Sequence, residues 1–140
     1  MIDIEYHKLN SEIKRLFRDC HGQVVDIGIL SNLVINPLES YLTYVFASEG
    51  IKSCVHMGKF NDLVESSVEC ANFKATIIFW DFLNISPSGL ASLEGQSEND
   101  LNNFSDGIIT QLNLSINNLR HNSLILINEF SCMLFNSLQY

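Results

Sequence analysis

Ser31 follows directly on an apolar segment, Val24 to Leu30, and is the first candidate for a chemical role in this sequence. A polar turn and an amphipathic segment come next, so the pattern predicts a strand, a turn and a helix in succession. In an open parallel sheet, ligands bind outside the carboxyl ends of the strands, and a serine hydroxyl placed there can act as a nucleophile in acyl transfer. Ser31 is therefore the candidate catalytic residue.

Other polar or small residues are expected at the ends of the remaining strands. The Gly58 N–H group and the Asn84 side-chain amide could donate hydrogen bonds to an oxyanion. The candidate residues for binding a ligand or an oxyanion are Asn32, Gly58, Asn61, Asp81 and Asn84, and Glu129 and Ser131 follow the last predicted strand. Each of these residues also has a purely structural explanation. Ser31 and Asn32 could satisfy backbone groups of a turn. Gly58 could adopt a positive φ, and Asn84 could cap a loop.

A serine nucleophile needs a general base, and the histidines are poorly placed to supply one. The four histidines are His7, His21, His56 and His121, and none of them follows a predicted strand. The periodicity places His56 in the middle of the second strand, as a core or edge-strand side chain. The sequence therefore predicts a chain that is not catalytic alone, or one whose base comes from an unexpected position or another subunit.

Asp81, at the end of the third predicted strand, has the position of a phosphoacceptor in receiver domains. Those domains also require acidic metal ligands after the first strand, where this chain has Ser31 and Asn32. Asp26 lies inside that strand rather than at its tip. We therefore expect Asp81 to cap its loop or to pair with a lysine such as Lys59, and we expect no metal site and no cofactor.

Composition limits the partners of this chain. It has 140 residues, 46% hydrophobic and 17% charged, with a net charge of −8, so the basic surface that nucleic acid requires is missing. The low charged fraction favours a surface that faces another domain or subunit, and a homo-oligomer is one form of this. No segment is apolar for the roughly 18 residues of a membrane span. Cys20, Cys54, Cys70 and Cys132 form no C-x-x-C pair, which predicts buried reduced thiols in a cytoplasmic protein.

Hydrophobic periodicity predicts alternating helices and strands. Helices are expected near 4–20, 37–48 and 100–120, with Asn36 capping the second, and strands near 24–30, 52–57, 75–82 and 123–130. Residues 60–68 are a short helix or irregular, and 83–99 form a long loop over the strand ends. The fold class is α/β, a three-layer α/β/α sandwich with a mostly parallel sheet in flavodoxin-like order, and Phe79 and Trp80 should both be buried if helices cover both faces.

The segments I-G-I-L-S-N at 27–32, V-H-M-G-K-F-N at 55–61 and I-I-F-W-D-F-L-N at 77–84 resemble the N-terminal domain of FkbH-like proteins. In that family an SGNH-hydrolase-like α/β domain precedes a haloacid-dehalogenase-type domain. By this resemblance, Ser31, Gly58 and Asn84 match the first three conserved blocks of the SGNH pattern. The Gly-Asp before the serine, the Gly-x-Asn-Asp after the third strand and a late Asp-x-x-His are missing, as is the phosphatase motif D-x-D-x-T.

The resemblance implies one SGNH-like domain over residues 1–140, with an N-terminal helix at 1–22, an α/β core at 23–130 and a C-terminal extension at 131–140. It implies an auxiliary or docking domain of a biosynthetic enzyme in polyketide or surface-polysaccharide assembly, with glyceryl or acyl loading onto a carrier protein. The expected partner is an acyl carrier protein or a separate catalytic domain. The alternative is a small serine esterase or acyltransferase that uses Ser31.

Overall fold

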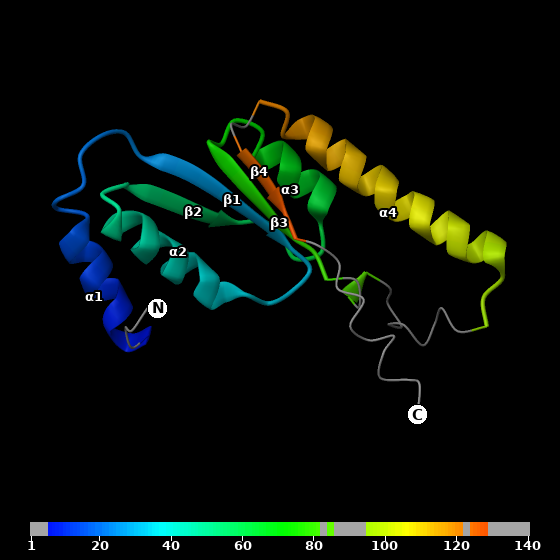
Figure 1. The fold of residues 1–140 in the computed structure, drawn as a ribbon, viewed down its shortest axis with the longest axis horizontal. Coiled ribbons are helices and arrows are strands. Elements are labelled where there is room, and N and C mark those ends of the chain that lie inside the picture. The colour runs from blue at the N-terminus through cyan, green and yellow to red at the C-terminus, as the bar shows by residue number, and fades with distance from the viewer. Residues whose placement is uncertain (1–5, 82–83, 86–94, 122–123, 129–140) are drawn as a thin grey trace.

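The computed structural model describes residues 6–81, 84–85, 95–121 and 124–128. In these ranges four helices alternate with four strands (Figure 1), and their bounds are α1 Tyr6–Leu16, β1 Val25–Ser31, α2 Asn36–Ser48, β2 Ser53–Met57, α3 Leu63–Glu69, β3 Ala75–Phe79, α4 Glu98–Asn118 and β4 Leu124–Ile127. None of the described helices is long and apolar enough to cross a membrane.

The four strands form one parallel sheet in the order β2-β1-β3-β4. Because the chain leaves β1 to one side for β2 and then crosses to the other side for β3, β1 is central, and the flavodoxin-like order predicted from right-handed crossovers is confirmed. Two helices, α1 and α2, lie on one side of the sheet, and α3 and α4 lie on the other (Figure 1). The predicted three-layer α/β/α arrangement is therefore observed.

Alternate residues of each strand face the two helical layers. Toward α3 and α4, Leu30, Ile78 and Trp80 pack in one buried cluster with Leu63 of α3 and Ile108 of α4. Toward α2, a second cluster joins strand residues to the apolar side of that helix and contains Ile27, Ile29 and Val55 with Leu38, Leu42 and Phe46. The sheet therefore separates two cores.

The structure corrects the expectation that Phe79 is buried. Trp80 is only 4% exposed, but Phe79 is 36% exposed, and Leu124 and Leu126 of β4 are each 49% exposed. Phe79 alternates with Trp80 and therefore faces the layer of α2, which covers β2 and β1. In the described part of the chain no helix covers β3 and β4 on that side, so the outer half of this sheet face is apolar and open.

Several element boundaries differ from the predicted ones for local reasons. The predicted Asn36 cap is wrong, because Ile35 occupies the N-cap position of α2, Asn36 begins the helix and no side chain caps it. The helix α4 begins two residues early, at Glu98, since Ser97 and Asp100 form a capping box. The segment at 60–68 forms most of the helix α3, which ends at Glu69 and whose N-cap Asp62 accepts a hydrogen bond from Glu65 N–H. The predicted loop at 83–99 and the extension at 131–140 lie largely or wholly outside the described residues.

Candidate functional site

The carboxyl ends of the strands bring the predicted site residues to one edge of the sheet. Ser31 ends β1, Gly58 follows β2, and Asp81 lies two residues after β3. A hydrogen bond from Asn61 N–H to the Ser31 carbonyl, 3.1 Å long, joins the loop after β2 to the last residue of β1. This edge, beside the central strand where the chain changes direction, is where open α/β sheets bind ligands. Glu129 and Ser131 are outside the described residues.

Ser31 has the turn contacts of its structural alternative. The residue is 8% exposed, and its hydroxyl accepts a hydrogen bond from Leu33 N–H at 2.9 Å and lies 3.2 Å from the Leu33 carbonyl, to which it donates. Among the described residues, no hydrogen bond links this hydroxyl to a histidine. The geometry therefore accounts for a serine here as a turn residue, and a nucleophilic role for Ser31 stays a prediction.

Two asparagine side chains hold the segment that follows β3. Asn32, which is 1% exposed, accepts a hydrogen bond from Asp81 N–H at 2.7 Å and donates to the Asp81 carbonyl at 2.8 Å. Asn128, after β4, makes the same pair of bonds to the backbone of Trp80, at 2.7 and 2.9 Å. We call this the asparagine clamp. It explains why β3 ends at Phe79 rather than at 82, since side-chain amides replace the strand partners of the next two residues.

The Gly58 N–H group is engaged within the sheet. It donates to the Ile29 carbonyl at 2.8 Å and so continues the pairing of β2 with β1 past the last residue of β2. Gly58 does not have a positive φ, whereas Asn61 does, at 56°. A Cβ atom on Gly58 would lie 2.8 Å from both the Leu30 Cδ2 and the Ser66 Cβ atoms, so glycine is required where the chain after β2 approaches β1 and α3 closely.

Asp81 and Asn84 contact each other, as expected for a capped loop. Asn84 Nδ2 donates to Asp81 Oδ2 at 2.7 Å. Lys59, the alternative partner of Asp81, instead bonds Glu65 and lies 3.7 Å from a Glu69 carboxylate oxygen. The Glu65 hydrogen bond raises the pKa of Lys59 above its ordinary value. The candidate edge is therefore built from side chains that largely satisfy backbone groups or one another.

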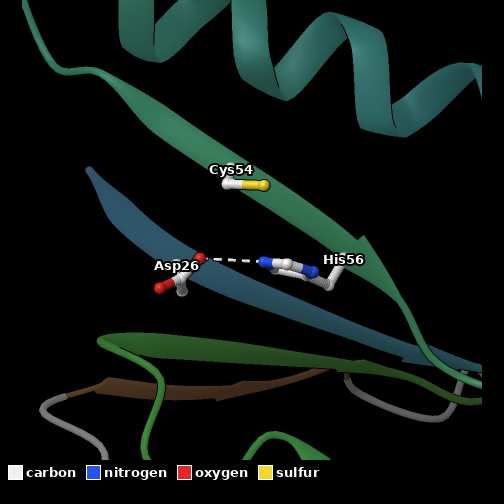
Figure 2. Close-up of side chains that lie close together, drawn as sticks. All are labelled: Asp26, Cys54 and His56. Carbon is white, nitrogen blue, oxygen red and sulfur yellow. Dashed lines mark hydrogen bonds and ion pairs between the residues drawn. The ribbon is translucent and has the colours of Figure 1, made fainter.

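A second cluster, which was not predicted from the sequence, lies nearer the amino ends of β1 and β2. Asp26 of β1 and Cys54 and His56 of β2 point from one face of the sheet, away from α2 (Figure 2). His56 Nε2 and Asp26 Oδ1 are 2.8 Å apart, and one donor atom from each of the three residues lies within 4.8 Å of the others. Cys54 is exposed, so the prediction of buried thiols is wrong for this residue and right for Cys70.

Two features of the sequence could have indicated this cluster. The alternation Cys54-Val55-His56 places thiol and imidazole on the same side of a strand. Asp26 is an isolated carboxylate in an apolar strand, and the register pairs it directly with Cys54. What could not be read from the sequence was this register, and hence that the two strands bring the three side chains together.

A hollow adjoins the cluster on the side of Asp26. Its volume is about 370 Å³, and its lining includes Asp26, Asn72, Phe73, Lys74 and His121. The Phe73 ring also packs against the His56 ring, with centroids 4.7 Å apart. The cluster is thus open to solvent on one side and bordered by a concave polar surface.

Comparison with known proteins finds a shared fold without a close relative. No protein-family model matches the chain, and no match was found among curated proteins. A similar solved structure is the N-terminal part of the protein BF1531 from Bacteroides fragilis, which contains a phosphatase domain and is complexed with Mg. The TM-score is 0.66 and the identity 12%, over 96% of this chain and 36% of that one. The two chains share a fold. This chain spans about a third of the length of that neighbour.

Proposed function

We propose that this chain is an SGNH-like auxiliary domain of the FkbH-like type, which docks against a phosphatase-type catalytic domain of a biosynthetic enzyme. The class of pathway that the resemblance implies is polyketide or surface-polysaccharide assembly, with acyl or glyceryl loading onto a carrier protein. In this proposal the chain positions a partner and does not itself break a bond.

The fold comparison supports the proposal. The three sequence segments that resemble FkbH-like proteins fall on β1, on β2 with its loop, and on β3 with its loop. The neighbour from Bacteroides fragilis contains a phosphatase domain, in keeping with the second domain of the FkbH-like family. At 12% identity the likeness concerns the fold, so the role of a partner domain is an inference.

The observation that carries the proposal is the open apolar face of β3 and β4. Phe79, Leu124 and Leu126 are 36%, 49% and 49% exposed on a sheet that parallel architecture normally covers on both sides. Contiguous apolar surface of this kind marks an interaction site in soluble proteins. A catalytic domain seated there would supply the cover that the described helices do not provide.

The state of the carboxyl edge favours docking over catalysis. The Gly58 N–H group, proposed as an oxyanion donor, is bonded to Ile29, and the Asn84 amide is bonded to Asp81. General-base assistance is typically worth about 10²–10⁴-fold in rate, and the described histidines make no hydrogen bond to Ser31. We therefore expect the chain alone to cleave simple esters no faster than its Ser31→Ala variant.

Docking is tested with a phosphatase-type domain that carries D-x-D-x-T and is encoded by the same or a neighbouring gene. Leu126→Ser should weaken binding about tenfold or more in titration calorimetry, because burying a leucine contributes about 1.5–3 kcal/mol. Leu114→Ser is the matched control, since Leu114 is equally 49% exposed but lies on α4, on the other side of the sheet. Equal affinities for the two variants would contradict docking through this face.

The enzyme alternative is tested with the purified chain and an activated ester such as p-nitrophenyl acetate. A rate that disappears in Ser31→Ala, while circular dichroism shows the fold intact, would refute the docking proposal and establish the esterase. A rate that survives the substitution would exclude Ser31 as the nucleophile.

A further inference from the structure

The cluster of Asp26, Cys54 and His56 combines three kinds of donor atom on two adjacent strands. The parallel register sets Asp26 opposite Cys54 and Gly28 opposite His56. The His56 ring reaches from β2 toward β1, and its Nε2 atom lies 2.8 Å from Asp26 Oδ1 (Figure 2). Cys54 lies on the same side, two residues before His56. Strand geometry alone therefore places a thiol, an imidazole and a carboxylate together.

We propose that these three residues bind a zinc ion. Thiolate sulfur, imidazole nitrogen and carboxylate oxygen are the protein donors that Zn²⁺ uses, whereas Mg²⁺ and Ca²⁺ prefer sites made of oxygen atoms. The thiolate and the carboxylate would together balance the two charges of the ion. Binding would release the Cys54 thiol proton to solvent, and the proton on His56 Nε2 would pass through water to Nδ1 or to solvent. Two bonds to the metal would then replace the hydrogen bond between His56 and Asp26.

Zinc binding would require only small movements of the three side chains from their present distances. Tetrahedral zinc with bonds of about 2.0–2.3 Å sets neighbouring donor atoms about 3.3–3.6 Å apart. The Asp26 and His56 atoms, now at 2.8 Å, would separate slightly, and any donor pair near the 4.8 Å limit would close by about 1 Å. The side chains of His56 and Asp26 are 42% and 49% exposed, so they have room to move without disturbing the core.

Three protein ligands leave one position of a tetrahedral ion open, as in catalytic rather than structural zinc sites. The hollow beside Asp26 borders the cluster, with Lys74 and His121 in its lining. Water or a small anion would occupy the fourth position from that side. The contact between the Phe73 and His56 rings would help to hold the imidazole in place, as groups around metal ligands commonly do.

This inference is independent of the proposed docking function, because the open apolar face is formed by β3 and β4 and lies on the opposite side of the sheet.

The test uses the full chain in a phosphine reductant, titrated with Zn²⁺ and separately with Co²⁺. We expect one zinc per chain and, with cobalt, a thiolate charge-transfer absorption that reports a sulfur ligand. A large excess of Mg²⁺ should not displace the zinc.

Cys54→Ser and Asp26→Asn should each lower zinc affinity by more than the roughly 10–100-fold that loss of an outer-shell partner costs. Cys54→Ser should also abolish the cobalt charge-transfer band. Cys20→Ser and Asp106→Asn are the matched controls, since Cys20 lies near the end of α1 and Asp106 on α4, and both should bind zinc as the parent chain does.

Circular dichroism of each variant checks that the fold persists, which the exposure of the three side chains favours. Zinc affinity that is the same in Cys54→Ser and Cys20→Ser, or several weak ions per chain with no thiolate band, would mean an adventitious ion only and would overturn the proposal. The docking measurements with Leu126→Ser would be unaffected by that result.

Discussion

Gly58→Ala should destabilise the fold although it adds a single methyl group. The new Cβ atom would lie 2.8 Å from the Leu30 Cδ2 and Ser66 Cβ atoms and 2.9 Å from Ser66 Oγ. Leu30 and Ser66 are both 0% exposed, so neither can move aside freely. Overpacking of this kind costs about 1–3 kcal/mol, and disturbing the 2.9 Å hydrogen bond from Lys59 N–H to Ser66 Oγ adds about 1 kcal/mol.

Gly107→Ala provides the control, because a Cβ atom on this α4 residue meets nothing within 4 Å. Alanine in a helix interior should stabilise that variant by about 0.5–1 kcal/mol. Urea unfolding followed by the fluorescence of the single, buried Trp80 gives both free energies of unfolding. We expect Gly58→Ala to lose about 2–4 kcal/mol, with faster hydrogen exchange at the Lys59 amide. A Gly58→Ala chain as stable as the parent would refute the close contact of Gly58 with Leu30 and Ser66.

Three further outcomes are expected. Ile78→Ala, at a fully buried position of β3, should cost about 2–5 kcal/mol in thermal or urea unfolding, and no loss would mean that this strand is not central. Asn32→Ala should cost about 2–4 kcal/mol, because both backbone groups of Asp81 lose their partners, and an unchanged midpoint would disprove that role. Burial raises the pKa of the Cys70 thiol from 9.0 to about 11, so the native chain keeps a proton that the unfolded chain releases, and stability should fall as pH rises from about 9 to 11. Cys70→Ala should remove that pH dependence, and at pH 8 a thiol reagent should modify Cys54 but not Cys70 in the native protein.

The sequence predicted the fold well for strands that are buried on both faces of the sheet. Near-continuous apolar runs identified β1 and the start of β3, and the right-handed crossover rule gave the strand order. Prediction failed for Phe79, because a run of apolar residues cannot show that a covering helix is missing from one side of an outer strand. It failed at the end of β3 because the bonds that replace the ladder come from Asn32 and Asn128, which are distant in sequence.

The sequence predicted where the residues of the candidate site lie better than it predicted what they do. The rule for parallel strands correctly brought Ser31, Asn61 and Asp81 to one edge. It gave no weight to Asp26 and His56, which lie inside strands, because their proximity depends on the register of β1 against β2. The contact between His56 and Asp26 is a property of the pair of strands rather than of either one.

The asparagine clamp also fixes which residue type the end of β1 can carry. The Asn32 side-chain amide has both donor hydrogens and an acceptor oxygen, as a peptide group has a donor and an acceptor, and the Asp81 backbone bonds to both kinds of atom. Asn32→Asp would place a carboxylate oxygen 2.8 Å from the Asp81 carbonyl oxygen, where the two would repel each other. An acidic residue at this point is what a receiver-type phosphoacceptor needs for its metal ion. The hydrogen bonds that hold the segment after β3 thus disfavour an acidic residue at position 32, where a receiver-type site would carry a metal ligand.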